Sequence, residues 1–153
     1  MYQRILVPFD ASPTSRKGLE EAIRLARLSG GALRLLHVVE VTKYATGFET
    51  CATYINEVIP VMKQEGHAIL EQGKRMAEGS GLSAETVLLE SMGSRLADLI
   101  INEATTWQAD IIVLGTHGRR GMDRLLLGSD AEQVIRLSPV PVLLVRGNEA
   151  SRP

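Results

Sequence analysis

The apolar residues of this chain form short uninterrupted runs that alternate with stretches in which they recur every three or four positions. Residues 5–7 form such a run, which is the pattern of a strand buried on both faces of a parallel sheet. The wholly apolar runs at residues 111–114 and 142–145 predict two further strands. Residues 33–39 and 84–89 are rich in leucine, valine and threonine and also predict strands. We therefore expect the fold to be built on these strands.

Helical spacing fills the intervals between the strands. Ser12 can accept a hydrogen bond as an N-cap, and Pro13 suits the first turn of the helix that follows. Pro60 marks either the start or a kink of a long helix, after a loop at residues 41–53 that shows no clear period and that we expect to be mobile. The expected helices span residues 13–29, 58–76, 93–107 and 129–137.

Strands that alternate with helices predict right-handed crossovers, and therefore an open, mostly parallel sheet with helices on both faces. This is a Rossmann-like α/β fold. A chain of 153 residues with 44% hydrophobic content can bury one core, so we expect a single domain over residues 1–153. Ligands bind such sheets beyond the carboxyl ends of the strands, where Asp10, Val38 and Gly115 are expected to lie.

The composition narrows the range of partners. The chain has 17 basic and 18 acidic residues and a net charge of -1, which argues against nucleic-acid binding and against a basic membrane-binding patch. No apolar run approaches the roughly 18 residues of a membrane span, and the short apolar stretch before Asp10 leaves no room for a secretory signal. The single cysteine, Cys51, permits no internal disulfide. We therefore expect a cytoplasmic protein.

The segment from Gly115 to Ser129 has the composition of an anion-binding site. Its glycines allow backbone N–H groups to approach an anion without an intervening Cβ, and the helix expected from Ser129 presents the positive end of its dipole. The side chains in this segment that can offset a polyphosphate are His117, Arg119, Arg120 and Arg124. We therefore expect phosphate groups to bind here.

Two common nucleotide-binding motifs are absent from the chain. Arg120 stands where the motif GxxxxGK[ST], counted from Gly115, requires glycine, and residues 10–13 do not fit GxGxxG. Neither a P-loop NTPase nor an ordinary dinucleotide dehydrogenase is supported. No cluster of His, Cys or carboxylates has metal-ligand spacing, so we expect no dedicated protein metal site.

Several of these residues can also serve the fold alone. Ser129 and Glu132 have the spacing of a capping box. Asp10 can cap the first helix, or it can accept a hydrogen bond from a ribose hydroxyl or an adenine amino group. His37 fits a hydrogen-bonded sheet residue better than a ligand, and Trp107 fits core packing better than base stacking.

Over nearly its whole length the chain resembles the universal stress proteins of the ATP-binding kind. The resemblance includes the sequence ILVPFD at residues 5–10 and LHV at residues 36–38. Its most specific element is the spacing Gly, two residues, Gly, nine residues, Gly-Ser, which is met by Gly115, Gly118, Gly128 and Ser129. The resemblance implies a five-stranded parallel sheet in the order 3-2-1-4-5.

The resemblance also implies where a nucleotide would bind. The adenosine would lie near Asp10 and the phosphates near Gly118 and Gly128, often with a divalent cation such as Mg²⁺ or Mn²⁺. We expect the nucleotide contacts to be Pro8, Asp10, Val38, Leu114, Gly115, His117, Gly118, Arg119, Gly128, Ser129 and Asp130. A homodimer paired through residues 142–145 is also implied, and it agrees with an apolar edge strand that would otherwise be open to unwanted pairing.

The chain departs from the family pattern at two positions. Ala11 stands where a glycine or an aromatic residue often follows the aspartate, and Asp130 replaces a small or apolar residue after the Gly-Ser pair. An acid in the first turn stabilises a helix by roughly 0.3 to 1 kcal/mol, but it repels a triphosphate. We expect Asp130 to point away from the phosphates or to share a divalent cation with them.

The function expected from these features is that of a regulatory protein of stress adaptation, which binds ATP, or ADP or AMP, and acts as a dimer. The stress role rests on the resemblance alone. One alternative is a slow ATPase, although the segment supplies charge and no evident base to orient water. The other is a nucleotide-free dimerisation or chaperone-like module, against which the intact glycine spacing argues.

Overall fold

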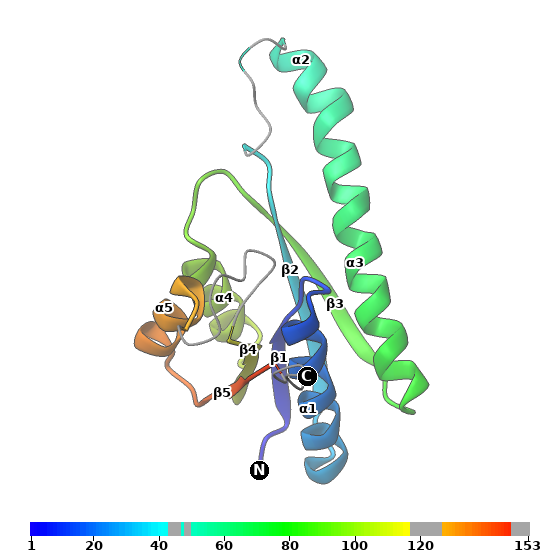
Figure 1. Cartoon of the computed structure of the whole chain (residues 1–153), viewed down its shortest axis with the longest axis vertical. Coiled ribbons are helices and arrows are strands. Elements are labelled where there is room, and N and C mark those ends of the chain that lie inside the picture. Colours follow the sequence, from blue (N-terminus) through cyan, green and yellow to red (C-terminus); the bar gives the residue numbers. More distant parts are fainter. Residues whose placement is uncertain (43–46, 48–49, 117–126, 148–153) are drawn as a thin grey trace, which may run out of the picture.

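The computed structural model describes residues 1–42, 47, 50–116 and 127–147. Within them, five parallel strands form one sheet in the order β3-β2-β1-β4-β5, and helices cover both of its faces (Figure 1). The strands are β1 (Arg4–Pro8), β2 (Ala32–Glu40), β3 (Ala84–Ser91), β4 (Ile111–Gly115) and β5 (Val142–Val145). The expected fold class and strand order are confirmed.

In the described part of the chain, helices lie on both faces of this sheet. The helices are α1 (Pro13–Ser29), α2 (Cys51–Thr53), the π-helical turn η1 (Tyr54–Val58), α3 (Ile59–Gly79), α4 (Leu96–Thr106) and α5 (Ser129–Leu137). One core lies between the sheet and the pair α1 and α3, and the other between the sheet and the pair α4 and α5. None of the helices in the described ranges combines the length and apolarity that crossing a membrane requires.

Strand β1 shows why its residues form a continuous apolar run. Ile5 and Val7 belong to the core under α1 and α3, whereas Leu6 belongs to the core under α4 and α5. All three have 0% of their surface exposed, and each buried aliphatic side chain contributes about 1.5–3 kcal/mol of transfer free energy. Both faces of the strand must therefore be apolar.

Helix α1 begins as its sequence predicts. The Ser12 Oγ accepts a hydrogen bond from the Ser15 N–H at 3.2 Å, and Pro13 occupies the first helical turn. The helix ends at Gly30, whose φ of 68° lies in the left-handed region that favours glycine. The N-cap therefore fixes where the turn after β1 becomes a helix.

The long helix α3 begins at Ile59, next to Pro60. The proline has no N–H and its ring crowds the carbonyl four residues earlier, and the turn before it, η1, is a wider π-helical turn. Helical structure is already present before Pro60, in η1. The last three residues of the expected loop at residues 41–53 form α2. Figure 1 shows α2 and the start of α3 extending well beyond the end of the sheet.

Two boundaries differ from the sequence-based expectation. Strand β3 continues to Ser91, and α4 begins at Leu96 instead of near Gly93. Gly93 has a φ of 96°, and the Ser91 hydroxyl donates to the Ser94 carbonyl at 3.1 Å. These residues form a turn held against the end of the sheet, which delays the start of the helix.

Candidate functional site

The turn after β1 is organised around Asp10. The Asp10 carboxylate accepts a hydrogen bond from the Ser12 N–H at 2.9 Å, and the Asp10 N–H donates to the Ser15 hydroxyl at 3.4 Å. The N-cap of α1 is Ser12, so the interpretation of Asp10 as the cap is wrong. Asp10 instead shapes the turn that precedes the cap, just past Pro8 at the carboxyl end of β1.

Ala11, the next residue, has an unusual backbone conformation. Its φ is 61°, in the left-handed region that costs a non-glycine residue roughly 1–2 kcal/mol. The Ala11 carbonyl accepts a hydrogen bond from Arg16 Nε at 3.0 Å. A glycine at this position would adopt the same turn without that cost.

His37 supports the same turn from β2. Its Nδ1 lies 2.8 Å from the Phe9 carbonyl oxygen, and because a carbonyl only accepts, Nδ1 carries the proton. The interpretation of His37 as a hydrogen-bonded sheet residue is therefore confirmed. The neighbouring Val38 lies on the other face of β2, against the core under α4 and α5.

The carboxyl end of β4 lies beside the carboxyl end of β1. The two strands pair directly, with Leu6 opposite Ile112, so their carboxyl ends leave the sheet side by side. Leu114 is 7% exposed, and Gly115 ends the strand. Beyond it, the Thr116 N–H donates to the Val145 carbonyl at 3.0 Å, which ties the end of β4 to β5.

A hydrogen bond brings the start of α5 back to the end of β4. The Gly128 N–H donates to the Thr116 carbonyl at 2.9 Å, so the start of α5 is held beside the end of β4. Gly128 is the N-cap of α5 and has no side chain to occupy the space before the helix. The first N–H groups of a helix have no acceptor within it and attract anions.

Ser129 and Asp130 form the first turn of α5, and each is at least partly exposed. The capping-box interpretation is wrong, because the cap is Gly128 and the Glu132 carboxylate accepts from Arg136 at 3.0 Å. The Ser129 hydroxyl therefore does not serve as the cap of its own helix. Asp130 places a carboxylate in the same first turn.

The expected contact residues that the structure describes lie beyond or near the carboxyl ends of β1, β2 and β4. They are Pro8, Asp10, Val38, Leu114, Gly115, Gly128, Ser129 and Asp130. The rest lie outside the described residues: His117, Gly118 and Arg119, with Arg120 and Arg124. Within the described ranges, no group of three or more His, Cys, Asp or Glu side chains can hold a metal ion.

Two residues at this edge were not expected from the sequence. Thr14, in the first turn of α1, lies directly against Gly115, and Arg16 holds the Ala11 carbonyl. The Ser12-Pro13 signal locates the start of the helix but does not say what its first turn contacts. Neither contact can be read from the local sequence, because each depends on an element that is distant along the chain.

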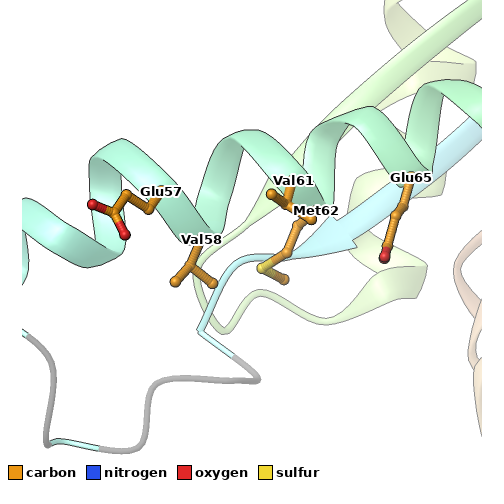
Figure 2. Close-up of a pocket in the computed structure, with 5 residues that line it drawn as sticks. All are labelled: Glu57, Val58, Val61, Met62 and Glu65. Atoms are coloured by element: carbon orange, nitrogen blue, oxygen red, sulfur yellow. The ribbon is translucent and has the colours of Figure 1, made fainter.

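A separate pocket lies along the projecting helix (Figure 2). It has a volume of about 390 Å³ and is lined by Glu57, Val58, Val61, Met62 and Glu65. Its charged groups are carboxylates, which repel a phosphate. The pocket therefore does not suit the anion that the strand-end edge is expected to bind.

Comparison with known proteins gives one family. The model of the universal stress protein family matches residues 1–146. Universal stress protein MJ0531 of Methanocaldococcus jannaschii is 34% identical over 146 residues, covering 95% of this chain and 83% of that protein. Universal stress protein YxiE of Bacillus subtilis is 34% identical over 151 residues, covering 95% of this chain and 100% of that protein.

Solved structures give the same result for the fold. MJ0577 of Methanocaldococcus jannaschii superposes with a TM-score of 0.83 at 27% identity, covering 98% of this chain and 99% of that chain. A universal stress protein in complex with cAMP gives 0.68 at 23%, covering 96% and 98%. One from Archaeoglobus fulgidus in complex with dAMP gives 0.66 at 23%, covering 94% and 98%. The last two likenesses concern the fold alone.

Proposed function

The chain belongs to the universal stress protein family, and we propose that it binds an adenine nucleotide, ATP foremost, at the edge of the sheet where β1 and β4 end. The nucleotide acts as a regulatory ligand. The protein works as a homodimer in stress adaptation, and its one cysteine, Cys51, which is exposed and free, suits the reducing cytoplasm.

The observation that carries this proposal is the hydrogen bond from the Gly128 N–H to the Thr116 carbonyl. It supports phosphate binding at the start of α5, because it holds Gly128 beside Thr116 at the carboxyl end of β4. Phosphates bound there would contact Gly118, Gly128 and Ser129, and the positive end of the α5 dipole would favour their charge.

The adenosine half of the proposed site is formed by the carboxyl ends of β1, β2 and β4. Pro8, Asp10 and Val38 would surround the base, with Leu114 and Gly115 near the ribose. Hydrogen bonds with Ser12 and Ser15 hold the Asp10 turn at the carboxyl end of β1. Two proteins of this fold have been solved with cAMP and with dAMP, which makes adenine nucleotides the first ligands to test.

The proposed homodimer would pair through β5. This strand lies at the edge of the sheet beside β4, and Leu143 on it is 39% exposed. An apolar edge strand in water favours pairing with another strand. Light scattering of the parent and of Leu143→Lys tests it: a dimer in the parent and a monomer in the variant support the pairing, and a dimer in both contradicts it.

The experiment that tests nucleotide binding is analysis of the small molecules released when the purified protein is denatured. We expect an adenine nucleotide to be released, or ATP to bind on titration if the purified protein is empty. Failure of both would contradict the proposal. A single-turnover assay with Mg²⁺ then measures hydrolysis, which we expect to be weak or absent because positioning without a base gives little turnover.

A further inference from the structure

Arg16 makes contacts on two different elements. Its Nε donates to the Ala11 carbonyl at 3.0 Å, and its Nη2 donates to Gln72 Oε1 on α3 at 2.5 Å. Its Nη1 lies 3.7 Å from the sulfur of Met76, one turn further along α3. The guanidinium therefore bridges the turn after β1 and the face of α3 that looks toward α1.

The Ala11 end of this bridge stabilises a conformation that alanine does not favour. Ala11 has a φ of 61°, and a charged donor on its carbonyl gives a stronger hydrogen bond than a neutral one. The bond holds the peptide that follows Asp10. It therefore fixes the direction of the turn on which the proposed adenosine contact sits.

Helix α3 also contacts the residue before Asp10. A Cβ built on Gly73 would lie 3.0 Å from the Phe9 ring and 2.8 Å from Leu35 Cδ1, so the absence of a side chain at Gly73 allows the ring to pack on the helix backbone. Gly73 follows Gln72 directly. One turn of α3 thus touches both neighbours of Asp10, Phe9 by packing and Ala11 through Arg16.

We propose that Arg16 is a positioning residue that couples the Asp10 turn to α3, so that nucleotide binding at the turn and the docking of α3 strengthen each other. The inference rests on the proposed nucleotide site. A contact that stabilises the bound form of the turn must itself be stabilised by the ligand, because coupling between two sites is reciprocal. The helix that projects from the sheet (Figure 1) would thereby respond to whether nucleotide is bound.

Nucleotide affinity of Arg16 variants is the first test. Arg16→Met removes both hydrogen bonds and should weaken ATP binding by about tenfold, the value of one charge-assisted hydrogen bond. Gln72→Met removes only the α3 end and should weaken it less, and Arg16→Lys should be intermediate. The matched control is Arg24→Met, which removes an arginine of the same helix whose pair with Glu21 is exposed; it should leave affinity unchanged.

The number of phosphates separates positioning from simple charge attraction. If Arg16 positions the adenosine turn, Arg16→Met should weaken ATP, ADP and AMP by the same factor. If it only attracts the anion, the loss should grow with the number of phosphates, and the proposal would be overturned. If the parent binds ATP and Arg16→Met binds it with the same affinity, the positioning role of Arg16 is overturned. The proposed function is not contradicted by that result.

Amide hydrogen exchange of α3 is the second test, with a readout that a merely structural arginine would not move. ATP should slow exchange at residues 71–77 in the parent and leave it unchanged in Arg16→Met at saturating ATP. Equal slowing in both proteins overturns the coupling. A parent protein that binds no adenine nucleotide at all contradicts the proposed function, and the inference fails with it.

Discussion

Thr14 and Gly115 approach so closely that a Cβ built on Gly115 would lie 2.8 Å from the carbonyl carbon of Thr14 and 2.9 Å from its carbonyl oxygen. Thr14 belongs to the first turn of α1, which follows the Asp10 turn, and Gly115 ends β4. This contact therefore sets the spacing between the start of α1 and the end of β4. It also gives Gly115 a role in the fold that is separate from any ligand.

Gly115→Ala should destabilise the fold. The added methyl group meets backbone atoms of Thr14, which cannot rotate away, so the first turn of α1 must shift at a cost of about 1–3 kcal/mol. The melting temperature should fall by about 2–4 °C for each kcal/mol, measured by thermal denaturation.

The matched control for that variant is Gly79→Ala. Outside its own turn of helix, no described atom lies within 4 Å of a Cβ built on Gly79, at the end of α3. Alanine favours a helix by up to about 1 kcal/mol over glycine. This variant should be as stable as the parent or more so. Equal stability of Gly115→Ala and the parent would contradict the close contact with Thr14.

Glu40 should make stability depend on pH in the acid range. The hydrogen bond from the Thr42 hydroxyl, at 2.7 Å, lowers the pKa of this carboxyl below its ordinary 4.5. Burial opposes this lowering, and the Gly93 N–H, at 3.1 Å, adds to it. A lowered pKa in the folded state stabilises the fold above the ordinary pKa, and this stabilisation is lost as pH falls through the lowered value.

The free energy of unfolding of the parent should therefore fall more steeply than that of Glu40→Gln as pH drops from about 5 to 3. Denaturant titrations at several pH values measure both slopes. Thr42→Val, which removes the main donor, should bring the Glu40 pKa back toward its ordinary value in an NMR titration. Parallel pH curves for the parent and Glu40→Gln would count against this explanation.

Arg34 should contribute to stability at the opposite end of the sheet. It pairs with Glu85 at 2.5 Å and with Glu103 at 2.7 Å, and its guanidinium stacks on Trp107 at 4.6 Å. Only 11% of the Glu103 side chain is exposed. Arg34→Met leaves that carboxylate without this cation and should cost about 1–3 kcal/mol, less than a fully buried pair.

Chemical denaturation measures this cost against an exposed ion pair. Arg24→Met breaks a pair with Glu21 whose side chains are 67% and 41% exposed, and it should change stability by no more than about 1 kcal/mol. Similar losses in both variants would mean that the cluster around Arg34 adds nothing beyond a surface pair.

The fold was predictable because the composition of a strand reflects how much of it is buried. The continuous apolar runs at β1 and β4 required two covered faces, and Ser12 with Pro13 marked the start of α1. Boundaries were less certain where tertiary contacts decide them. The turn at Gly93 is held by the Glu40 carboxylate, a contact between distant residues that no local pattern predicts.

The candidate site was predictable in its elements and not in its contacts. Glycine spacing and strand ends located Asp10, Gly115 and Gly128. The Ser129 and Glu132 spacing suggested a capping box, yet Gly128 is the cap, because a cap is defined by backbone angles that the sequence does not state. The role of Arg16 depends on α3 packing beside α1, and therefore could not be predicted from either helix alone.

Asp130 should make nucleotide affinity depend on a divalent cation. Its carboxylate lies in the first turn of α5, where it would repel a bound triphosphate unless Mg²⁺ or Mn²⁺ lies between them. ATP titrations with and without Mg²⁺ should show stronger binding with the metal in the parent and a smaller difference in Asp130→Val. Metal-independent affinity in both proteins would rule out a shared cation.

The most direct test of the account is calorimetric titration of ATP with Mg²⁺ into nucleotide-free parent protein, Gly128→Val and the control Gly79→Val. Gly128 has φ -58° and ψ 145°, angles open to any residue, so valine should leave the fold intact and place its side chain where a phosphate must approach. We predict that the parent and the control bind ATP and that Gly128→Val does not. Undiminished binding by Gly128→Val, or none by the parent, would contradict the proposed site.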